Sequence, residues 1–429
     1  MAPRERTSRH TRPLVVILLA SIVAVVVRRA TRGCEHVRIG EKCDGRRGRA
    51  AFELDRDETE LRVDSRRKVL SDPRTRYKFA SNRGKHALVT GGAGFIGSHC
   101  VKRLLEEGYA VSTIDNMSRG NGGAIRTLRR MAPEGSFRAV YGDLGSRDDV
   151  LEAFRNTNKH VDVVLHFAGV AYVGESMADP LRYYSNITSN TVTLLSVMHE
   201  VGVQNMIYSS TCATYGNVNK LPITELTPTQ PINPYGKSKL YAENAIKDYA
   251  LANPKFRSAI LRYFNVIGSD PEYKIGELPR AGLRQHGRIL GACFDAALKN
   301  TDKLTIMGTK HPTPDGTTIR DFIHVVDLVN AHIAVADKNK FDNPPTIYNV
   351  GTGRGVSMRE FIETCERVTG ADIKVYYESE PRPGDYAEVY ANVDKVELEL
   401  GWKANYTDLY ESLSHAWAFR KNIVDNRWD

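Results

Sequence analysis

The segment 86–116 constrains the fold more than any other part of this 429-residue chain. It reads HALVTGGAGFIGSHCVKRLLEEGYAVSTIDN, in which a short apolar run, a glycine-rich turn and an amphipathic stretch ending at Glu107 precede a second apolar run ending at Asp115. These periodicities predict a strand, a helix and a second strand. The turn contains glycines at a spacing of three, namely Gly91, Gly94 and Gly97. Glycine there permits a tight turn and close packing of the helix on the strand.

The same turn is typical of a dinucleotide site. Glycines allow backbone N–H groups to approach a pyrophosphate, and the helix N-terminus adds a partial positive charge. Asp115 stands 18 residues after Gly97, where a carboxylate can accept hydrogen bonds from an adenosine ribose. Because this carboxylate would repel a 2′-phosphate, NAD is expected over NADP, although Arg119 leaves NADP open. The alternative interpretation is a glycine turn with no ligand.

Strands and helices continue to alternate after this unit. Strands are expected within 137–144, 161–169 and 203–216, and helices over 147–158 and 180–201. This order predicts an α/β fold with a parallel sheet covered on both faces, and ligands at the carboxyl ends of its strands. Asp143, Phe167, Ala168 and the stretch 209–211 are expected at that edge.

Tyr235 and Lys239 stand four residues apart in the sequence PYGKSK. On a helix they share one face, so the ammonium would favour the ionised phenol and lower the pKa of Tyr235. An ordinary pair of helix-surface residues is the alternative. Thr211 ends an expected strand and Tyr235 begins the next expected helix, which places both at the ligand-binding edge.

Thr211, Tyr235 and Lys239 together resemble the catalytic set of the short-chain dehydrogenase/reductases. A series of segments over about residues 86–417 resembles the UDP-galactose 4-epimerase family of the extended members, especially the plant-type UDP-arabinose (UDP-xylose) 4-epimerases. The segments, in order, are VTGGAGFIGSH, HFAGVAYVGES, SSTCATYG, PYGKSK, LRYFNVIG, DGTTIRDFIHVVDL, YNVGTG and RPGD.

The resemblance implies a Rossmann-type doubly wound parallel sheet with a smaller mixed α/β substrate-binding domain. It places an NAD-binding domain at 86–265 and an interleaved nucleotide-sugar domain at 266–429. It implies NAD-dependent epimerisation at C4 of a UDP-sugar through a transient 4-keto intermediate, with Tyr235 as the base. Lys239 would bind the nicotinamide ribose, and Thr211 would bridge the phenol and the sugar oxygen.

The resemblance also implies two sets of binding residues. The expected cofactor contacts are Gly91, Gly94, Phe95, Ile96, Gly97, Asp115, Asn116, Asp143, Leu144, Phe167, Ala168, Asn186, Tyr235, Lys239 and Tyr263. The expected UDP-sugar contacts are Thr211, Asn265, Arg320, Arg382, Asp385 and Val389. Arginine suits the diphosphate because its guanidinium donates two parallel hydrogen bonds. Family members are commonly dimers, so a homodimer is expected.

The sequence leaves alternatives open for both the substrate and the reaction. Val389 stands where hexose epimerases have a tyrosine or cysteine, so UDP-L-arabinose and UDP-D-xylose are expected and UDP-glucose/UDP-galactose is the alternative. Related dehydratases and decarboxylases carry acids directly after the threonine, whereas this chain has Cys212 and Ala213, which cannot supply that proton. A non-catalytic NAD-binding scaffold is a distant alternative, because a fold does not fix a function.

The positive charge of the chain is confined to its N-terminal tail. Residues 1–85 contain 22 Lys and Arg against 11 Asp and Glu, whereas the remainder contains 38 against 40. The tail holds an uncharged apolar run at 13–27, followed by a polar stem. Fifteen residues are fewer than the roughly 20 of a usual membrane span, yet flanking arginines can reach the interface.

We therefore expect an uncleaved signal anchor at 13–27, with a cleaved signal peptide and an organelle transit peptide as alternatives. By resemblance, the address is the Golgi membrane in a single-pass type II arrangement, with an organelle-targeted or cytosolic location as the alternatives. Cys34 and Cys43 either form a disulfide or remain two separate thiols. The other four cysteines suit no metal site, so no metal is expected, and nothing in the folded part predicts a nucleic-acid partner.

Overall fold

The computed structural model describes residues 84–155, 159–278, 288–381 and 384–426. The apolar run 13–27 and the pair Cys34 and Cys43 lie outside the described residues. Within the described ranges, no helix has the length and apolar character needed to cross a membrane.

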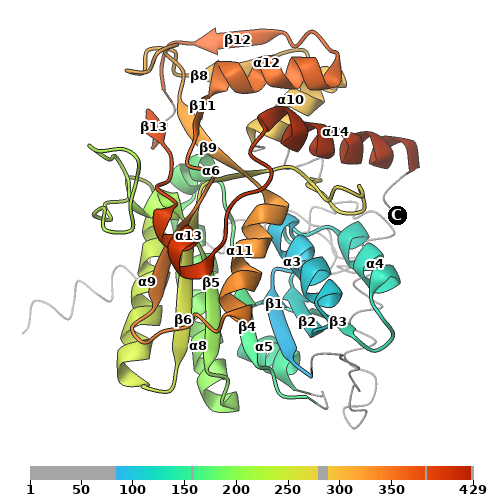
Figure 1. Ribbon diagram of the computed structural model, residues 1–429, viewed down its shortest axis with the longest axis vertical. Helices are drawn as coiled ribbons and strands as arrows, with labels where there is room; N and C mark the ends of the chain where they lie inside the picture. The colour runs from blue at the N-terminus through green and yellow to red at the C-terminus, as the bar shows by residue number, and fades with distance from the viewer. Residues whose placement is uncertain (1–83, 156–158, 279–287, 382–383, 427–429) are drawn as a thin grey trace, which may run out of the picture. The chain divides into compact units, whose positions relative to one another are not determined.

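A seven-stranded parallel sheet dominates the described part (Figure 1). Its strand order is β10-β6-β5-β4-β1-β2-β3, so the direction of winding reverses between β1 and β4. The strands are β1 (His86–Thr90), β2 (Ala110–Asp115), β3 (Phe137–Tyr141), β4 (Val163–His166), β5 (Asn205–Thr211), β6 (Arg257–Tyr263) and β10 (Thr346–Val350). The predicted doubly wound parallel sheet is confirmed.

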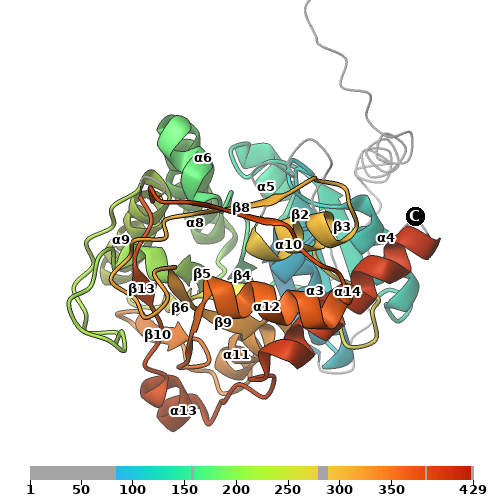
Figure 2. The same ribbon diagram turned by 90° about the horizontal axis from the view of Figure 1, so that it is seen from above.

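Helices cover both faces of this sheet (Figure 2). On one face lie α3 (Phe95–Glu106), α4 (Gly122–Met131) and α11 (Val325–Asp337); on the other lie α5 (Arg147–Phe154), α8 (Asn190–Val201) and α9 (Pro234–Ala252). In β1, Ala87 and Val89 join the hydrophobic cluster with α3 and α11, whereas Leu88 joins the cluster with α8 and α9. Burial on both faces explains why the strand reads as one continuous apolar run.

Two predicted helix ends differ from the structure, and the predicted stretch 180–201 keeps its bounds but is divided inside. The helix expected over 147–158 ends at Phe154, since the residues that follow are polar and offer no apolar face. The helix expected over 180–201 consists of α7 (Pro180–Tyr183), a π-helical segment Tyr184–Ser189 and α8. A π-helical turn inside an α-helix is frequent at functional sites. Helix α3 ends at Glu106, and Glu107 is its C-cap.

The smaller part is built around β9. Strands β7 (Asn265–Ile267), β9 (Ile319–His324), β11 (Gly355–Ser357) and β13 (Glu388–Val389) form one sheet, and β8 (Leu304–Met307) pairs with β12 (Val375–Glu378). Helices α10 (Ile289–Ala297), α12 (Met358–Thr369) and α14 (Leu409–Asn426) accompany these strands. Two further short helices of the chain are α6 (Val173–Ala178) and α13 (Asp394–Leu400). Strand β10 belongs to the large sheet and helix α11 packs on it, although both follow residue 266, so the chain passes back and forth between the two parts.

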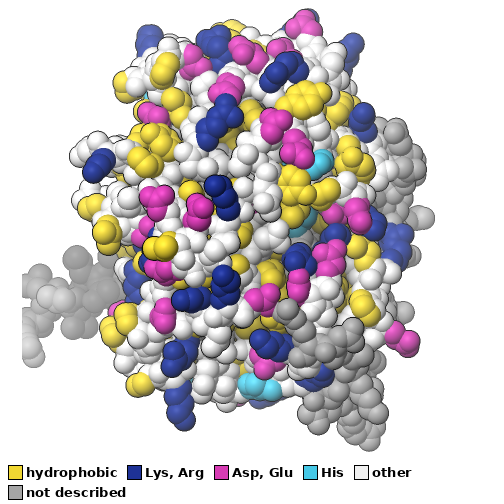
Figure 3. Space-filling view, viewed as in Figure 1, with side chains coloured by type: hydrophobic (Ala, Val, Ile, Leu, Met, Phe, Trp, Pro, Cys, Tyr) yellow, Lys and Arg dark blue, Asp and Glu magenta, His cyan; other side chains and the backbone are white. Residues whose placement is uncertain are grey.

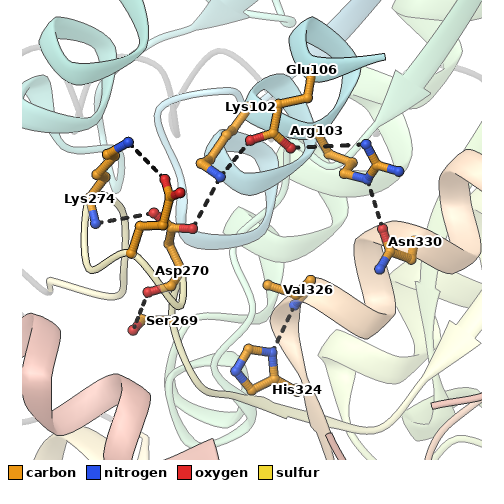
Figure 4. A network of polar contacts seen from close by, with 10 residues as sticks. Lys102, Arg103, Glu106, Ser269, Asp270, Lys274, His324, Val326 and Asn330 are labelled. Atoms are coloured by element: carbon orange, nitrogen blue, oxygen red, sulfur yellow. Dashed lines mark hydrogen bonds and ion pairs between the residues drawn. The ribbon is translucent and has the colours of Figure 1, made fainter. Parts of the chain in front are cut away.

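Polar contacts hold α3 against elements from later in the chain (Figure 4). Lys102 Nζ lies 2.6 Å from Glu106 Oε1 and 3.1 Å from Asp270 Oδ1. Burial disfavours the ammonium, but the two carboxylates outweigh it and raise the pKa of Lys102. Arg103 Nε donates to Asn330 Oδ1 on α11 at 3.1 Å. The helix that follows the glycine turn is thereby fixed from two directions.

The surface of the described residues mixes both signs of charge (Figure 3). On the face shown there, Lys and Arg side chains are interspersed with Asp and Glu. Mixing of this kind keeps the local potential low, whereas nucleic-acid-binding proteins cluster their basic residues.

Candidate active site

In the glycine turn that joins β1 to α3, backbone atoms pack closely together. Gly91 has φ +74°, a conformation that other residues rarely adopt, and its N–H donates to the carbonyl of Ile114 at 2.8 Å. A Cβ atom placed on Gly97 would lie 2.1 Å from the carbonyl oxygen of Gly91. Any larger residue at position 97 would therefore push α3 away from the turn.

The N-terminus of α3 fits an anionic ligand. Gly94 is the N-cap and provides no side-chain cap, and the first turn of the helix contains no acidic residue. The first N–H groups of the helix therefore face the groove without a carboxylate competing for them. The Asp115 carboxylate accepts from Ala93 N at 3.0 Å and from Met117 N at 2.8 Å, which fixes it beside the turn. These residues fit a dinucleotide, with the diphosphate at the helix and a ribose at the carboxylate.

A groove with an empty volume of about 580 Å³ opens at this edge of the sheet. The predicted residues that line it are Gly91, Gly94, Asp115, Asn116, Leu144, Phe167, Ala168 and Asn186. The lining residues that were not predicted as contacts are Ile114, Ser118, Arg119, Gly120, Gly142, Gly169, Val170 and Asn190. Most of these stand within a few residues of a predicted contact, so the strand ends themselves were the available signal.

The other predicted cofactor residues are not among those that line the groove. Asp143 accepts a hydrogen bond from Asn116 Nδ2 at 2.7 Å. Asn186, which does line the groove, belongs to the π-helical segment, and its Oδ1 accepts from Val170 N at 2.9 Å, which ties that segment to the loop after β4. The residues of the first turn of α3 are Phe95, Ile96 and Gly97, and Tyr263 ends β6.

Helix α9 presents its functional side chains on one buried face. Asn233 caps the helix by accepting from Gly236 N at 2.8 Å, and proline follows as the first helical residue. Tyr235, Lys239 and Glu243 then recur at intervals of four residues and are all buried. Thr211, the last residue of β5, hydrogen-bonds to the Tyr235 phenol and accepts from Ala213 N.

The electrostatics of the pair differ from the prediction. Burial raises the pKa of the Tyr235 phenol, while the Thr211 hydrogen bond and the Arg288 charge oppose that rise. Lys239 Nζ donates to the carbonyl of Ser209 at 2.8 Å, and burial lowers its pKa to about 7 against the opposing charge of Glu243. The pKa of Tyr235 is therefore raised rather than lowered in this structure, because loss of hydration outweighs the groups that oppose it. The effect of Lys239 on the phenolate stays a prediction.

Three predicted substrate residues lie together on the smaller sheet. Arg320 on β9 pairs with Asp385 at 2.5 Å and stands in register with Val389 on β13. Asn265 begins β7, which pairs with β9. Arg382 lies outside the described residues.

Hydrogen bonds and charge connect this sheet to the start of α9 and to the turn after β5. Tyr386 Oη donates to the carbonyl of Ala213 at 3.3 Å and accepts from Asn233 Nδ2 at 2.9 Å. The Arg320 charge acts on the thiol of Cys212, which directly follows Thr211. Tyr235 and Thr211 therefore border the same region as Arg320, Asp385 and Val389, which together form the Arg320 cluster.

One residue of this region had no signal in the sequence. The Cζ atom of Arg288 lies 5.9 Å from the ring centroid of Phe95, and its charge acts on the phenols of Tyr172, Tyr235 and Tyr263. More than 50 residues separate Arg288 from Tyr235, so only folding brings them together. Across the described ranges, no three His, Cys, Asp or Glu side chains are grouped as a metal site would require.

A glycine turn with uncapped helical N–H groups, a carboxylate at the end of β2 and a Tyr–Lys pair at one edge of a parallel sheet define a dinucleotide-dependent enzyme of the short-chain dehydrogenase/reductase class. Residues 87–351 match the NAD dependent epimerase/dehydratase family. The chain belongs to that family.

Known relatives and solved structures resemble this chain over most of its length. The chain is 53% identical over 337 residues to UDP-arabinose 4-epimerase 1 of Arabidopsis thaliana, which covers 78% of this chain and 79% of the relative. The UDP-glucose 4-epimerase of Bifidobacterium longum, solved with NAD+ and UDP, has a TM-score of 0.74 and 36% identity over 79% of this chain and 98% of its own. The UDP-glucose 4-epimerase of Stenotrophomonas maltophila, solved with NAD and formylated UDP-arabinopyranose, has a TM-score of 0.73 and 32% identity, covering 80% and 99%.

Proposed function

We propose that this chain is an NAD-dependent UDP-sugar 4-epimerase that interconverts UDP-L-arabinose and UDP-D-xylose. The observation that carries the proposal is the meeting of the dinucleotide groove, the Tyr235–Thr211 pair and the Arg320 cluster at one edge of the sheet. The relative from Arabidopsis thaliana, named a UDP-arabinose 4-epimerase, supports the pentose substrate.

Each residue of the site has a separate role in the proposed reaction. The glycine turn and Asp115 would hold NAD, which would supply a reversible hydride acceptor for C4 of the sugar. Tyr235 accepts the proton of the 4-hydroxyl as hydride leaves, and returns it when the hydride comes back. Thr211 stabilises the phenolate by its hydrogen bond. Lys239, held by the carbonyl of Ser209, is placed to bind ribose hydroxyls of the dinucleotide.

Inversion requires that the sugar turn while the rest of the substrate stays fixed. The Arg320 guanidinium suits the diphosphate, because it is already oriented by Asp385 at 2.5 Å and by the carbonyl of Ile319 at 2.9 Å. Val389, in register with Arg320, is apolar and makes no hydrogen bond through its side chain. A loosely held 4-keto sugar can therefore rotate beside a firmly held diphosphate.

UDP-glucose and UDP-galactose are the second candidate pair, because the solved relatives are named UDP-glucose 4-epimerases. The deciding experiment incubates the purified full chain in detergent with UDP-xylose and, separately, with UDP-galactose. Separation of the released sugars is expected to show arabinose from UDP-xylose at the higher rate. Formation of no 4-epimer from either substrate would end the epimerase proposal.

A matched pair of variants tests the base. Tyr235→Phe is expected to abolish turnover and to retain bound NAD, since the phenyl ring still fills its place. Tyr410→Phe is the control, because Tyr410 lies on α14 with 44% of its surface exposed. Unchanged activity in Tyr235→Phe would remove Tyr235 from this role.

We also propose that residues 13–27 anchor the chain in the Golgi membrane in a type II arrangement. The apolar run and the basic residues around it support this address. A fluorescent fusion of the full chain is expected to overlap a Golgi marker, and deletion of 13–27 is expected to release it. Overlap of both fusions with a cytosolic marker would contradict the proposal.

A homodimer is proposed through the helices beside the catalytic tyrosine. Leu181 on α7 and Val192 on α8 are 78% and 50% exposed, and Tyr241 on α9 lies on the same side of the sheet. Exposed apolar side chains gathered on neighbouring helices favour an interface. Val192→Glu is expected to shift the sedimentation of the detergent-solubilised chain to that of a monomer, and a wild-type monomer would refute the proposal.

A further inference from the structure

Tyr386 lies where three segments of the described chain meet: the stretch before β13, the turn after β5 and the start of α9. Its Oη atom accepts a hydrogen bond from Asn233 Nδ2 at 2.9 Å and donates one to the carbonyl of Ala213 at 3.3 Å. Tyr386 is 7% exposed and Asn233 is fully buried, so water does not readily replace these bonds. A buried polar group that loses its partner destabilises the arrangement around it. The hydroxyl of Tyr386 therefore ties the three segments together.

One side of Tyr386 borders the Arg320 cluster. Its backbone N–H donates to Asp385 Oδ1 at 3.2 Å, and Asp385 in turn orients the Arg320 guanidinium. The Cζ atom of Arg320 lies 5.9 Å from the centroid of the Tyr386 ring, within the range of a cation–π contact. Tyr386 is therefore linked to the group that is proposed to hold the diphosphate.

The bond to Asn233 leads to the proposed base. Asn233 Oδ1 accepts from Gly236 N at 2.8 Å and so fixes the first turn of α9, which contains Tyr235. The other end of this amide, Asn233 Nδ2, donates to Tyr386 and to the carbonyl of Gly384 at 3.2 Å. One side chain thus caps the catalytic helix and fastens it to the stretch that contains Tyr386.

The bond to Ala213 leads to the hydroxyl partner of the base. Ala213 N donates to Thr211 Oγ1 at 3.2 Å, while the Ala213 carbonyl accepts from Tyr386. A Cβ atom placed on Gly236 would lie 2.4 Å from the same carbonyl oxygen, so this turn and α9 are packed closely. Because a displacement of Tyr386 would act on both segments, its hydroxyl controls where Thr211 and the phenol stand relative to Arg320.

We propose that Tyr386 is a positioning residue of the proposed epimerase, whose hydroxyl holds the base Tyr235 in register with a diphosphate bound at Arg320. This inference rests on the proposed function, because it assumes a UDP-sugar whose 4-hydroxyl meets Tyr235. The sugar has to turn during the reaction, so its own contacts do not fix that alignment and the protein must supply it. A misplacement of about 1 Å can lower a rate about a hundredfold.

Removal of the hydroxyl tests this role. Tyr386→Phe keeps the buried ring and the Arg320–Asp385 pair, so the KM for the UDP-sugar and the NAD content are expected to stay near those of the wild type. The kcat is expected to fall about tenfold, because the buried hydrogen bonds of the hydroxyl no longer align the phenol. Tyr410→Phe is the control, because Tyr410 is 44% exposed on α14. An unchanged kcat, or a raised KM as the sole effect, overturns the proposal.

A matched change of the partner separates positioning from a general loss of packing. Asn233→Ser keeps an oxygen that can cap α9 but removes the Nδ2 donor, so its kcat is expected to fall like that of Tyr386→Phe. Because both variants break the same bond, the double variant is expected to fall no further than either single one. Losses that multiply in the double variant overturn the proposal.

Hydrogen–deuterium exchange gives a readout that does not depend on turnover. Added UDP is expected to slow amide exchange over 234–240 in the wild-type holoenzyme, since a bound diphosphate restrains the Arg320 cluster and Tyr386 transmits that restraint to α9. In Tyr386→Phe, UDP is expected to bind, as calorimetry measures, without slowing exchange over 234–240. Equal slowing in both proteins, or none in the wild type, overturns the proposal.

Failure of one variant or of the reaction leaves this test intact. If Tyr386→Phe does not fold, Asn233→Ser takes its place in the exchange comparison, and slowing equal to that of the wild type overturns the proposal. If the wild-type chain binds UDP but epimerises no UDP-sugar, the proposed reaction fails while the exchange comparison still decides the role of Tyr386.

Discussion

Replacement of Glu243 by glutamine tests how the catalytic helix is held in place. The Glu243 side chain is fully buried on the face of α9 that also carries Tyr235 and Lys239. It accepts from Ser210 Oγ at 2.6 Å and from Arg262 at 2.9 and 2.5 Å. Glutamine keeps the shape of the side chain but leaves the Arg262 guanidinium without a counter-charge.

The expected magnitude follows from the burial of both partners. Arg262 is 2% exposed, and a guanidinium is too basic to lose its proton in a protein, so Arg262 stays charged in the variant. Breaking a buried ion pair by removal of one partner costs about 3–5 kcal/mol. The Arg354–Glu360 pair has side chains 57% and 40% exposed, and Glu360→Gln is expected to cost no more than about 1 kcal/mol.

Urea unfolding of the full chain, followed by tryptophan fluorescence, measures the free energy of unfolding of each variant. The double variant Glu243→Gln with Arg262→Met is expected to recover much of the stability, because no uncompensated buried charge remains. A loss in Glu243→Gln no larger than that in Glu360→Gln would refute the reasoning. So would a double variant less stable than the single one.

Three further predictions concern the turn, the substrate site and acid pH. Gly97→Ala is expected to lose bound NAD, because its Cβ would meet the Gly91 carbonyl. Gly174→Ala is expected to retain NAD, because nothing lies within 4 Å of the added atom. The absorbance of NAD released by denaturation measures the content of each variant. Arg320→Met is expected to raise the KM for the UDP-sugar more than tenfold with little change in NAD content, and an unchanged KM would contradict its role. Burial lowers the pKa of five histidines to about 3 or 4, so the unfolded chain binds more protons than the folded one between those values and about 6.5. Stability is therefore expected to fall as the pH drops from about 6.5 to 4, and a thermal midpoint that rises on acidification would contradict this. These histidines are His86, His99, His166, His324 and His332.

Local patterns in the sequence were enough to predict the dinucleotide unit and the class of fold. Gly91, Gly94 and Gly97 mark a turn that side chains would obstruct, and Asp115 marks the end of the next strand. Such signals are local, because periodicity and backbone freedom act within a few residues. The spacing of Tyr235 and Lys239 likewise placed both on one helical face before any tertiary contact was known.

The charges that act at the site depend on contacts between distant segments. Lys239 follows Tyr235 by one helical turn, yet burial and the Ser209 carbonyl govern its ammonium, while Arg288 from a distant segment acts on the phenol. The π-helical turn that holds Asn186 and the register of Arg320 with Val389 also arise from packing between separate segments. Burial and electrostatic reach depend on which segments meet in space, and one-dimensional spacing does not record that.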